Sequence, residues 1–458
     1  MTVTWNAQNA AHLLRRTGFG ATISQIKSAT KSGMAKSVAK ILKTPKINDK
    51  IPPDVKSIED LQAWWVNLML DTPAPLIERL VLFWHNHFAT GHSKVGDFVY
   101  MHRQNTIFRK HAMGSFREMV TNVSRDPAML IWLDNNTNVK GKQNQNFARE
   151  LMELFTTGVN DKNGIANYTE TDVDEAAKAF TGWTVKDGIF FFNESKHDFG
   201  TKTFKGITGN LDGTDIINLL VVQPATAHRV ARQLFSYFAY DIPLDDPFIA
   251  ELANIYLAND TAIKPVLQRI FTSDQFYSDA SKNAGVKEPA VYLVSAFRPL
   301  KMKLQTIYIN KEEDESVSNT YALSNRLDQL GQSLFDPPTV FGWDYGLAWV
   351  TASGLLERAK VADWISEARD PTQLLQYKPE TILGPSYKKL TAQIAAERIL
   401  QNFGIQSPAL ATLGAIANYL MVDNAGNPVA IVWDEDTIDK KVRGAIALVL
   451  SSAEFQAT

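Results

Sequence analysis

The sequence contains no cysteine in its 458 residues. This absence excludes disulfide bonds, thiolate metal ligands and a cysteine nucleophile. It does not indicate a compartment, because a chain without cysteine is compatible with an oxidising as well as a reducing environment.

A strong charge bias and long apolar runs are also absent. The formal net charge is −2, so no overall field favours nucleic acid or an anionic membrane as a partner. The first residues lack the basic start and apolar run of a secretory signal. No stretch approaches the ~18 apolar residues that a membrane span needs. The sequence as written predicts a cytoplasmic protein without a transmembrane segment; a removed signal, or export together with a partner, would leave no trace in it.

What is present is a helical pattern. Hydrophobic residues make up 45% and charged residues 21% of the chain, which is ordinary for a folded protein. Apolar residues recur at three- and four-residue spacing in 77–88, 147–155 and 172–180, and again between 226 and 276. There is no βαβ alternation and no phosphate-binding glycine-rich loop. We therefore predict a mainly α protein.

Strand signals are few. Residues 188–193 are β-prone, and we expect them to pair with residues 201–206 across the turn-rich segment 194–200. Residues 428–433 are a candidate isolated strand. The predicted architecture is one large helical domain over 1–458 with a small inserted β-hairpin near 184–206. The alternative is a division near residue 285, into a half 1–285 that carries the polar residues and a helical half 286–458.

Histidines are unevenly distributed, and five of the eight lie between residues 85 and 111. His85 and His87 end a predicted apolar helix and precede the small residues 89–91. Two residues apart, their rings face different sides of a regular helix, but at a frayed last turn they could converge on one metal ion. The structural alternative is that one ring packs beside Trp84 while the other caps the helix end.

A second cluster of candidate ligands is acidic. Glu150 and Glu153 share a helix face, and Asn146 lies one turn earlier on it. Carboxylates at this spacing beside an apolar stripe can hold a shared cation, as in helical metal–carboxylate sites. The structural alternative is that Arg149 pairs with Glu153 while Glu150 is solvated.

The loop 159–170 loosely matches the twelve-residue calcium-binding loop. Four of its residues stand at suitable positions: Asp161, Asn163, Gly164 and Glu170. Val159 stands where the first carboxylate is expected, which counts against calcium. A polar turn followed by a capped helix explains the same residues.

Two further polar groups lie near the predicted hairpin and the segment before it. His197 and Asp198 fall in the turn 196–200, where they could orient a water molecule or complete a coordination sphere; equally, they are common turn residues. The segment 132–138 is rich in asparagine and contains Asp134. Its side chains either bind a polar ligand or cap the preceding helix.

Several separated motifs occur together in one order. They are Ala10–Gly20, Phe83–Phe88, Arg125–Leu130, Asn146–Gly158, Tyr168–Val173, Ala179–Trp183, His197–Asp198 and Phe335–Trp343. The set resembles the large bacterial family catalogued as domain of unknown function 1800, and the resemblance covers nearly the full chain, from Ala10 to Phe455. It implies no established activity. It does imply an association with exported proteins similar to alkaline phosphatases and sulfatases, and hence a partner in the cell envelope.

The resemblance also singles out polar residues that packing alone does not require. The family signature gathers His87, Asp134, Asn146, Glu150, Glu153, Glu170 and His197. One departure is visible, because the family usually has a glutamate where this chain has Gln145. If that acid is a ligand in relatives, this chain has lost it.

Our first hypothesis is a metal-dependent enzyme, hydrolytic or oxidative, with a mixed histidine–carboxylate site. The expected ligands are His85, His87, Glu150 and Glu153, and the expected catalytic residues are His197, Asp198 and Asp134. Such ligands suit iron, manganese or zinc, whereas calcium fits less well. The ion would activate a bound water or bind oxygen.

The second hypothesis is a non-catalytic binding or assembly protein that acts with an exported phosphatase- or sulfatase-like partner. Its recognition surface would be an exposed face such as Pro337–Gly346, where aromatic residues stand among prolines and glycines. Trp343 and Trp349 are core residues in the alternative interpretation of that segment. A third hypothesis, a calcium-stabilised surface protein, rests on the loop 159–170.

Overall fold

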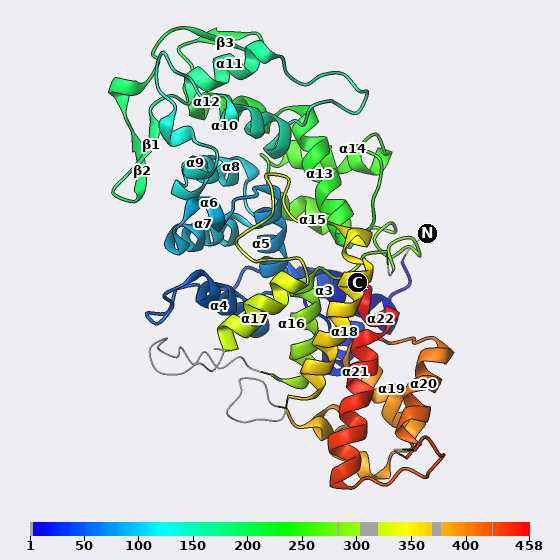
Figure 1. Ribbon diagram of the computed structural model, residues 1–458. Helices are drawn as coiled ribbons and strands as arrows, with labels where there is room; N and C mark the ends of the chain where they lie inside the picture. The colour runs from blue at the N-terminus through cyan, green and yellow to red at the C-terminus, as the bar shows by residue number, and fades with distance from the viewer. Residues whose placement is uncertain (1–2, 283, 303–318, 369–376, 424) are drawn as a thin grey trace, which may run out of the picture. The chain divides into compact units, whose positions relative to one another are not determined.

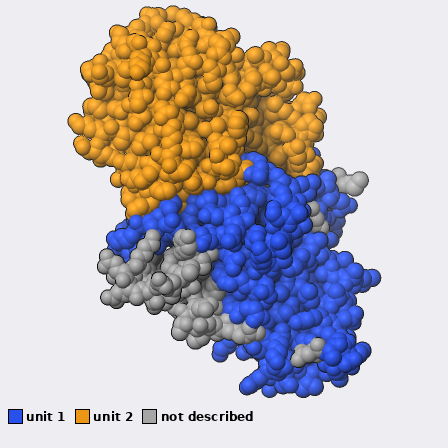
Figure 2. Space-filling view, viewed as in Figure 1, with its two compact units in different colours: residues 1–76, 273–334, 344–458 blue, residues 77–272, 335–343 orange. Residues whose placement is uncertain are grey.

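The computed structural model describes residues 3–282, 284–302, 319–368, 377–423 and 425–458. The chain divides into two compact units (Figure 2). Unit 1 consists of Met1–Leu76, Ser273–Leu334 and Asp344–Thr458, and unit 2 consists of Ile77–Thr272 and Phe335–Trp343. The domain boundary suggested near residue 285 stays a prediction.

Unit 2 is built mainly from α-helices (Figure 1). They are α5 (Pro75–His87, which begins at the end of unit 1), α6 (His92–Val95), α7 (Phe98–His111), α8 (Phe116–Ser124), α9 (Pro127–Trp132), α10 (Asn146–Glu150), α11 (Glu170–Ala179), α12 (Gly213–Val221), α13 (Pro224–Phe238), α14 (Pro247–Ala258) and α15 (Ile263–Phe271). Short helical turns occur at η1 (Asn135–Thr137), η2 (Leu151–Phe155) and η3 (Glu194–Lys196). The mainly helical class predicted from the sequence is confirmed.

The β-structure of unit 2 consists of two hairpins. Strand β1 (Trp183–Lys186) pairs with β2 (Ile189–Phe192), and β3 (Lys202–Phe204) pairs with β4 (Ile207–Gly209), both antiparallel. An inserted hairpin near 184–206 is therefore confirmed, but the expected pairing of 188–193 with 201–206 is not what the structure has. The reason is local: Asp187 and Gly188 both have positive φ, which makes a tight two-residue turn of the kind that closes hairpins.

The core of unit 2 is an aromatic cluster around the end of α5. The ring of His87 contacts Trp84, Phe88 and Phe116, and Phe88 stacks on Phe108 from α7. Aromatic rings bury large apolar areas and favour such edge and offset contacts. The His-x-His motif therefore lies inside this core.

Unit 1 is also helical. Its helices are α1 (Ala7–Arg16), α2 (Ile23–Ser32), α3 (Met34–Ile41), α4 (Ile58–Asp71), α16 (Pro289–Leu300), α17 (Asn319–Gln329), α18 (Ala352–Ser366), α19 (Ala392–Asn402), α20 (Leu410–Leu420), α21 (Arg443–Ser451) and α22 (Ala453–Gln456), with shorter turns at η4 (Gly346–Trp349), η5 (Pro379–Ile382), η6 (Tyr387–Lys389) and η7 (Thr437–Val442). Helix α16 is buried at every position from Pro289 to Phe297 and packs against α4. A helix that is buried all round in this way is central to its unit.

Two further predictions from the sequence bear on the fold. Residues 428–433 form no strand; Pro428 makes a single bridge with Val422, since a proline cannot donate to a ladder. No helix in the described part of the chain is long and apolar enough to cross a membrane.

Candidate carboxylate site on a π-helical turn

Helix α10 of unit 2 ends in an unusual backbone conformation. There the helix widens into the π-helical turn η2, Leu151–Phe155. Such turns are rare and often mark functional sites. Four of its carbonyls accept hydrogen bonds from outside the helix. Thr156 Oγ1 donates to Leu151 at 2.6 Å, Gly158 N to Met152 at 2.9 Å, Arg229 to Leu154 at 3.2 Å and His87 Nε2 to Phe155 at 3.0 Å.

Glu150 and Glu153 stand at the start and within this turn, and both side chains are partly exposed. Burial raises the pKa of Glu150 above its usual range, and the negative charge of Glu153 raises that pKa further. The two carboxylates are therefore close enough to interact, as their shared helix face predicted. Tyr168 donates a hydrogen bond to Glu153 Oε2 at 3.1 Å, and partial burial raises the pKa of Tyr168 to about 12. The phenol is thus a proton donor throughout the physiological range.

Arg149 does not pair with Glu153. Its guanidinium makes two 2.8 Å hydrogen bonds to the carboxylate of Glu170 and one of 3.2 Å to Gln145 Oε1. The amide of Gln145 also donates to Asp174. A glutamine at position 145 can accept from a cation and donate to a carboxylate at once, whereas a glutamate could only accept.

The two histidines of the His-x-His motif are buried and neutral. His85 is fully buried, its ring stacks on Trp343, and its Nε2 donates to the Thr90 carbonyl at 3.3 Å. Burial lowers the pKa of His85 to about 4. Burial, and then the charge of Arg229, lower the pKa of His87 to about 3.

A histidine that donates one ring N–H to a carbonyl keeps its other nitrogen as an acceptor, an arrangement that metal-bound histidines also use. Within the residues that the structure describes, however, no group of three or more histidine, aspartate or glutamate side chains is placed to hold a metal ion. The structure brings Glu150 and Glu153 together. Among the described contacts, His87 is connected to them through the backbone of η2, and His85 packs in the aromatic core.

His197 and Asp198 hold the connection between the two hairpins. His197 is buried, its Nδ1 donates to the Thr181 carbonyl at 2.7 Å, and its ring lies against Phe192 and Phe199. Asp198 Oδ1 accepts from Gly200 N at 2.8 Å, which closes a local turn. Both residues have structural partners at the positions where the sequence suggested catalytic roles.

Asp134 and the asparagines near it also have structural partners. Asp134 has positive φ and pairs with Lys94 at 2.9 Å on the surface. Asn138 is buried, and its amide donates to the Ala177 carbonyl at 2.9 Å. The Asn138 bond holds the segment after α9 against α11, and the Asp134 ion pair joins the segment to α6.

In the loop 159–170, both candidate calcium-binding carboxylates have partners within the protein: backbone N–H groups of the loop bond Asp161, and a side chain of α10 bonds Glu170. Asp161 Oδ1 accepts from the backbone N–H groups of Asn163 at 2.8 Å and Ile165 at 2.9 Å. Glu170 is paired with Arg149, and the N-cap of α11 is Thr169, in a reciprocal capping box with Asp172. A polar turn before a capped helix describes these contacts.

Sequence reasoning assigned no role to three residues that matter here. Tyr168 supplies the donor to Glu153, and Arg229 supplies a donor to η2 from 75 residues away. Asp126 caps α9 through Met129 N, and burial raises the pKa of its carboxyl to about 7. Tyr168 and Asp126 stand within family motifs that could have drawn attention to them. No local pattern marks Arg229.

These features define a mainly helical protein with a pair of interacting glutamates on a π-helical turn. A family profile described as "Protein of unknown function (DUF1800)" matches residues 12–457, so the chain belongs to that family. Comparisons with curated proteins and with solved structures give no significant match.

Proposed function

We propose that this protein is a metal-dependent hydrolytic enzyme whose cation is held by Glu150 and Glu153. The observation that carries the proposal is the electrostatic interaction of the two half-buried carboxylates on η2, where the charge of Glu153 raises the pKa of Glu150. Two like charges held together cost free energy. A divalent cation between them would turn that cost into a gain.

The chemistry of the donors favours a hard cation. Magnesium and manganese are commonly bound through one or two carboxylates and several waters. Asn146 lies one turn before Glu150 and is exposed, so its amide oxygen is available to the same face. A cation there would supply a bound water of lowered pKa, while Tyr168 orients Glu153 through its hydrogen bond. His85 and His87 act in this proposal as supports of the turn and of the core.

Manganese titration followed by electron paramagnetic resonance tests the proposal, because bound Mn²⁺ loses the signal of the free ion. Protein purified without chelator should bind one Mn²⁺, and the double variant Glu150→Gln/Glu153→Gln should not. The matched control is Glu194→Gln, which removes an exposed glutamate of η3. Wild-type protein that takes up no manganese, or a double variant that binds like wild type, removes the proposal.

A second candidate function is supported by one surface of unit 1. Four apolar side chains around η4 and the start of α18 are exposed: Tyr345 by 55%, Leu347 by 79%, Leu355 by 45% and Leu356 by 57%. Clusters of exposed apolar residues often mark protein interfaces. Trp343 and Trp349 of the same segment are buried, as the alternative interpretation had it.

This surface supports the alternative proposal of an assembly protein acting with the phosphatase- or sulfatase-like partner that the family resemblance implies. The test is co-elution of the purified chain with the partner encoded beside its gene. Leu347→Asp/Leu356→Asp should abolish co-elution, whereas the Glu150→Gln/Glu153→Gln variant should retain it. The absence of co-elution with the unaltered chain counts against this function.

A further inference from the structure

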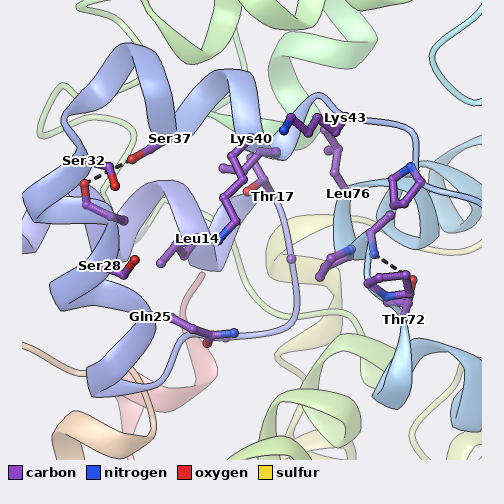
Figure 3. A pocket seen from close by; sticks show the side chains of 18 of the residues that line it. Leu14, Thr17, Gln25, Ser28, Ser32, Ser37, Lys40, Lys43, Thr72 and Leu76 are labelled. Carbon is purple, nitrogen blue, oxygen red and sulfur yellow. Dashed lines mark hydrogen bonds between the residues drawn. The ribbon is translucent and has the colours of Figure 1, made fainter.

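A cavity in unit 1 has several basic side chains in its lining. It has a volume of about 750 Å³ and lies between α1, α2, α3, the segment 72–76 and α16 (Figure 3). Four basic side chains line it: Lys36, Lys40, Lys43 and Arg298. No aspartate or glutamate is among the described residues of its lining. In a chain with net charge −2, this local excess of positive charge requires an explanation.

Among the described contacts none of the four basic groups forms an ion pair or a side-chain hydrogen bond. Arg298 is the most buried of them; burial lowers its pKa, and Asp71 offsets this only as a nearby charge. Among the described residues no carboxylate is hydrogen-bonded to the Arg298 guanidinium, so its burial carries a desolvation cost that an anionic ligand would offset.

The part of the lining that α2 contributes carries hydroxyl groups at the spacing of a helix. Ser24, Ser28 and Ser32 follow one another every four residues along α2, and all three line the cavity. Residues four apart share a helix face. Lys36 and Lys40 stand at the same spacing on α3. Figure 3 shows Ser28 on the α2 side and Lys40 and Lys43 on another side of the space. Hydroxyl and ammonium groups that line one cavity are suitable donors for an oxyanion.

Apolar side chains supply much of the remaining lining. Leu14, Ile41, Pro45, Pro73 and Leu76 contribute to it. Ser37 and Thr72 direct their hydroxyls into backbone contacts, with Ala29 O at 3.1 Å and Ala74 N at 3.1 Å. A cavity of this size, with apolar walls and a few convergent polar groups, is typical of small-molecule sites. A bare inorganic anion would leave the apolar walls unused.

We propose that this cavity binds a small organic anion, a phosphate or carboxylate attached to an apolar body. The acidic group lies among Lys36, Lys40 and Arg298, and the apolar body lies against Leu14 and the prolines of the 72–76 segment. The site is separate in the chain from Glu150 and Glu153. It therefore stands or falls independently of the proposed cation site.

Isothermal titration calorimetry with three probes tests the proposal: octyl phosphate, octanoate and the neutral 1-octanol. At least one of the two anions should bind with one-to-one stoichiometry, and 1-octanol should bind at least about tenfold more weakly. Added salt should weaken binding of the anion, because ammonium groups at the rim are screened. Tighter binding of octyl phosphate identifies the natural ligand as a phosphate, and tighter binding of octanoate identifies it as a carboxylate.

The matched variants separate this site from general charge effects. Lys36→Gln/Lys40→Gln should weaken binding of the anion about tenfold, and Ser28→Phe, which fills the cavity from its rim, should abolish it. Lys27→Gln/Lys31→Gln removes the same charge from exposed positions of α2 outside the lining and should leave affinity unchanged. All of these positions are exposed, so the variants should keep the thermal unfolding temperature of wild type.

Three outcomes would overturn the proposal. They are no saturable binding of either anion up to about 1 mM, an equal loss of affinity in both lysine pairs, and binding of 1-octanol as tight as that of the anions.

Discussion

The end of α5 and the turn η2 use potential metal ligands in opposite ways. His85 and His87 are surrounded by aromatic rings, and burial keeps both neutral. Glu150 and Glu153 are half-exposed, and their charges act on each other. One hydrogen bond, from His87 to the Phe155 carbonyl, joins the two regions. Burial, more than the type of side chain, separates a group that holds the fold from one that is available to a ligand.

The largest expected effect tests the structural side of this comparison. His85→Ala removes a ring packed between Phe108, Phe335 and Trp343 together with a hydrogen bond. We expect the free energy of unfolding to fall by about 3 kcal/mol, the usual cost of a cavity of this kind. Urea denaturation followed by circular dichroism measures it. Glu153→Ala is the comparison variant and should change stability by less than about 1 kcal/mol. Equal losses of stability in His85→Ala and Glu153→Ala would contradict the difference between the buried and the exposed region.

The second prediction concerns pH. In the unfolded chain His87 takes up a proton below about pH 6.5, whereas the folded protein resists protonation until the pH nears its lowered pKa of about 3. The stability that neutral His87 contributes is therefore present above pH 6.5 and is lost as the pH falls toward 3. At pH 5 this loss is about 2 kcal/mol.

The variant His87→Gln should remove the His87 share of that dependence, because glutamine does not titrate; the share of buried His85, whose pKa is lowered to about 4, remains. Urea midpoints measured at half-unit steps from pH 7 to pH 4 give the slope. A variant with the slope of wild type would show that His87 is already charged, or is exposed, in the folded state.

The sequence predicts these two regions unequally. The helical periodicity located α5, α10 and α11 correctly, because burial of one face imposes the spacing that the sequence displays. The same periodicity placed Glu150 and Glu153 on one face. It could not show that the helix widens into a π turn there, since two of the four donors to that turn come from His87 and Arg229, which are distant in the chain.

The histidine cluster was the harder case. Five histidines within a short span look like a ligand set, yet the rings of His85 and His87 pack with residues from α7, α8 and the segment 335–343. Only tertiary contacts reveal that packing. The predicted strand pairing was wrong for a different reason. Asp187-Gly188 is a strong two-residue turn signal in the sequence, and it pairs the strands on its two sides with each other.

A smaller effect on stability is expected at Glu150, in the region that we propose is functional. Because its pKa is raised, Glu150 favours the folded state below its ordinary pKa, and this contribution is lost as the pH rises and the group ionises beside Glu153. Glu150→Gln should therefore raise stability at pH 8, by less than about 1 kcal/mol because water screens a half-exposed pair. The gain should vanish near pH 4.

Thermal unfolding at pH 8 and pH 4 measures that effect on stability. Mn²⁺ titration of the same variant then measures whether cation binding is lost. A variant that gains stability while it loses cation binding behaves as a functional group does, since such sites are often held at a cost to stability. Lower stability at pH 8 would mean that Glu150 has a structural partner and would contradict the comparison.

The smallest expected effect on stability concerns Tyr168. Its hydroxyl donates to Glu153 from within the loop 159–170, and a single hydrogen bond to a partly exposed carboxylate contributes little to folding. Tyr168→Phe should leave the free energy of unfolding within about 0.5 kcal/mol of wild type. If the hydroxyl orients Glu153 for a cation, the same variant should bind Mn²⁺ several-fold, about threefold to tenfold, more weakly, because groups that orient a ligand affect affinity out of proportion to stability. Unchanged affinity would mean that Glu153 is positioned by η2 alone, and the donors to that turn, His87 above all, would then be the residues that connect the buried region to the exposed one.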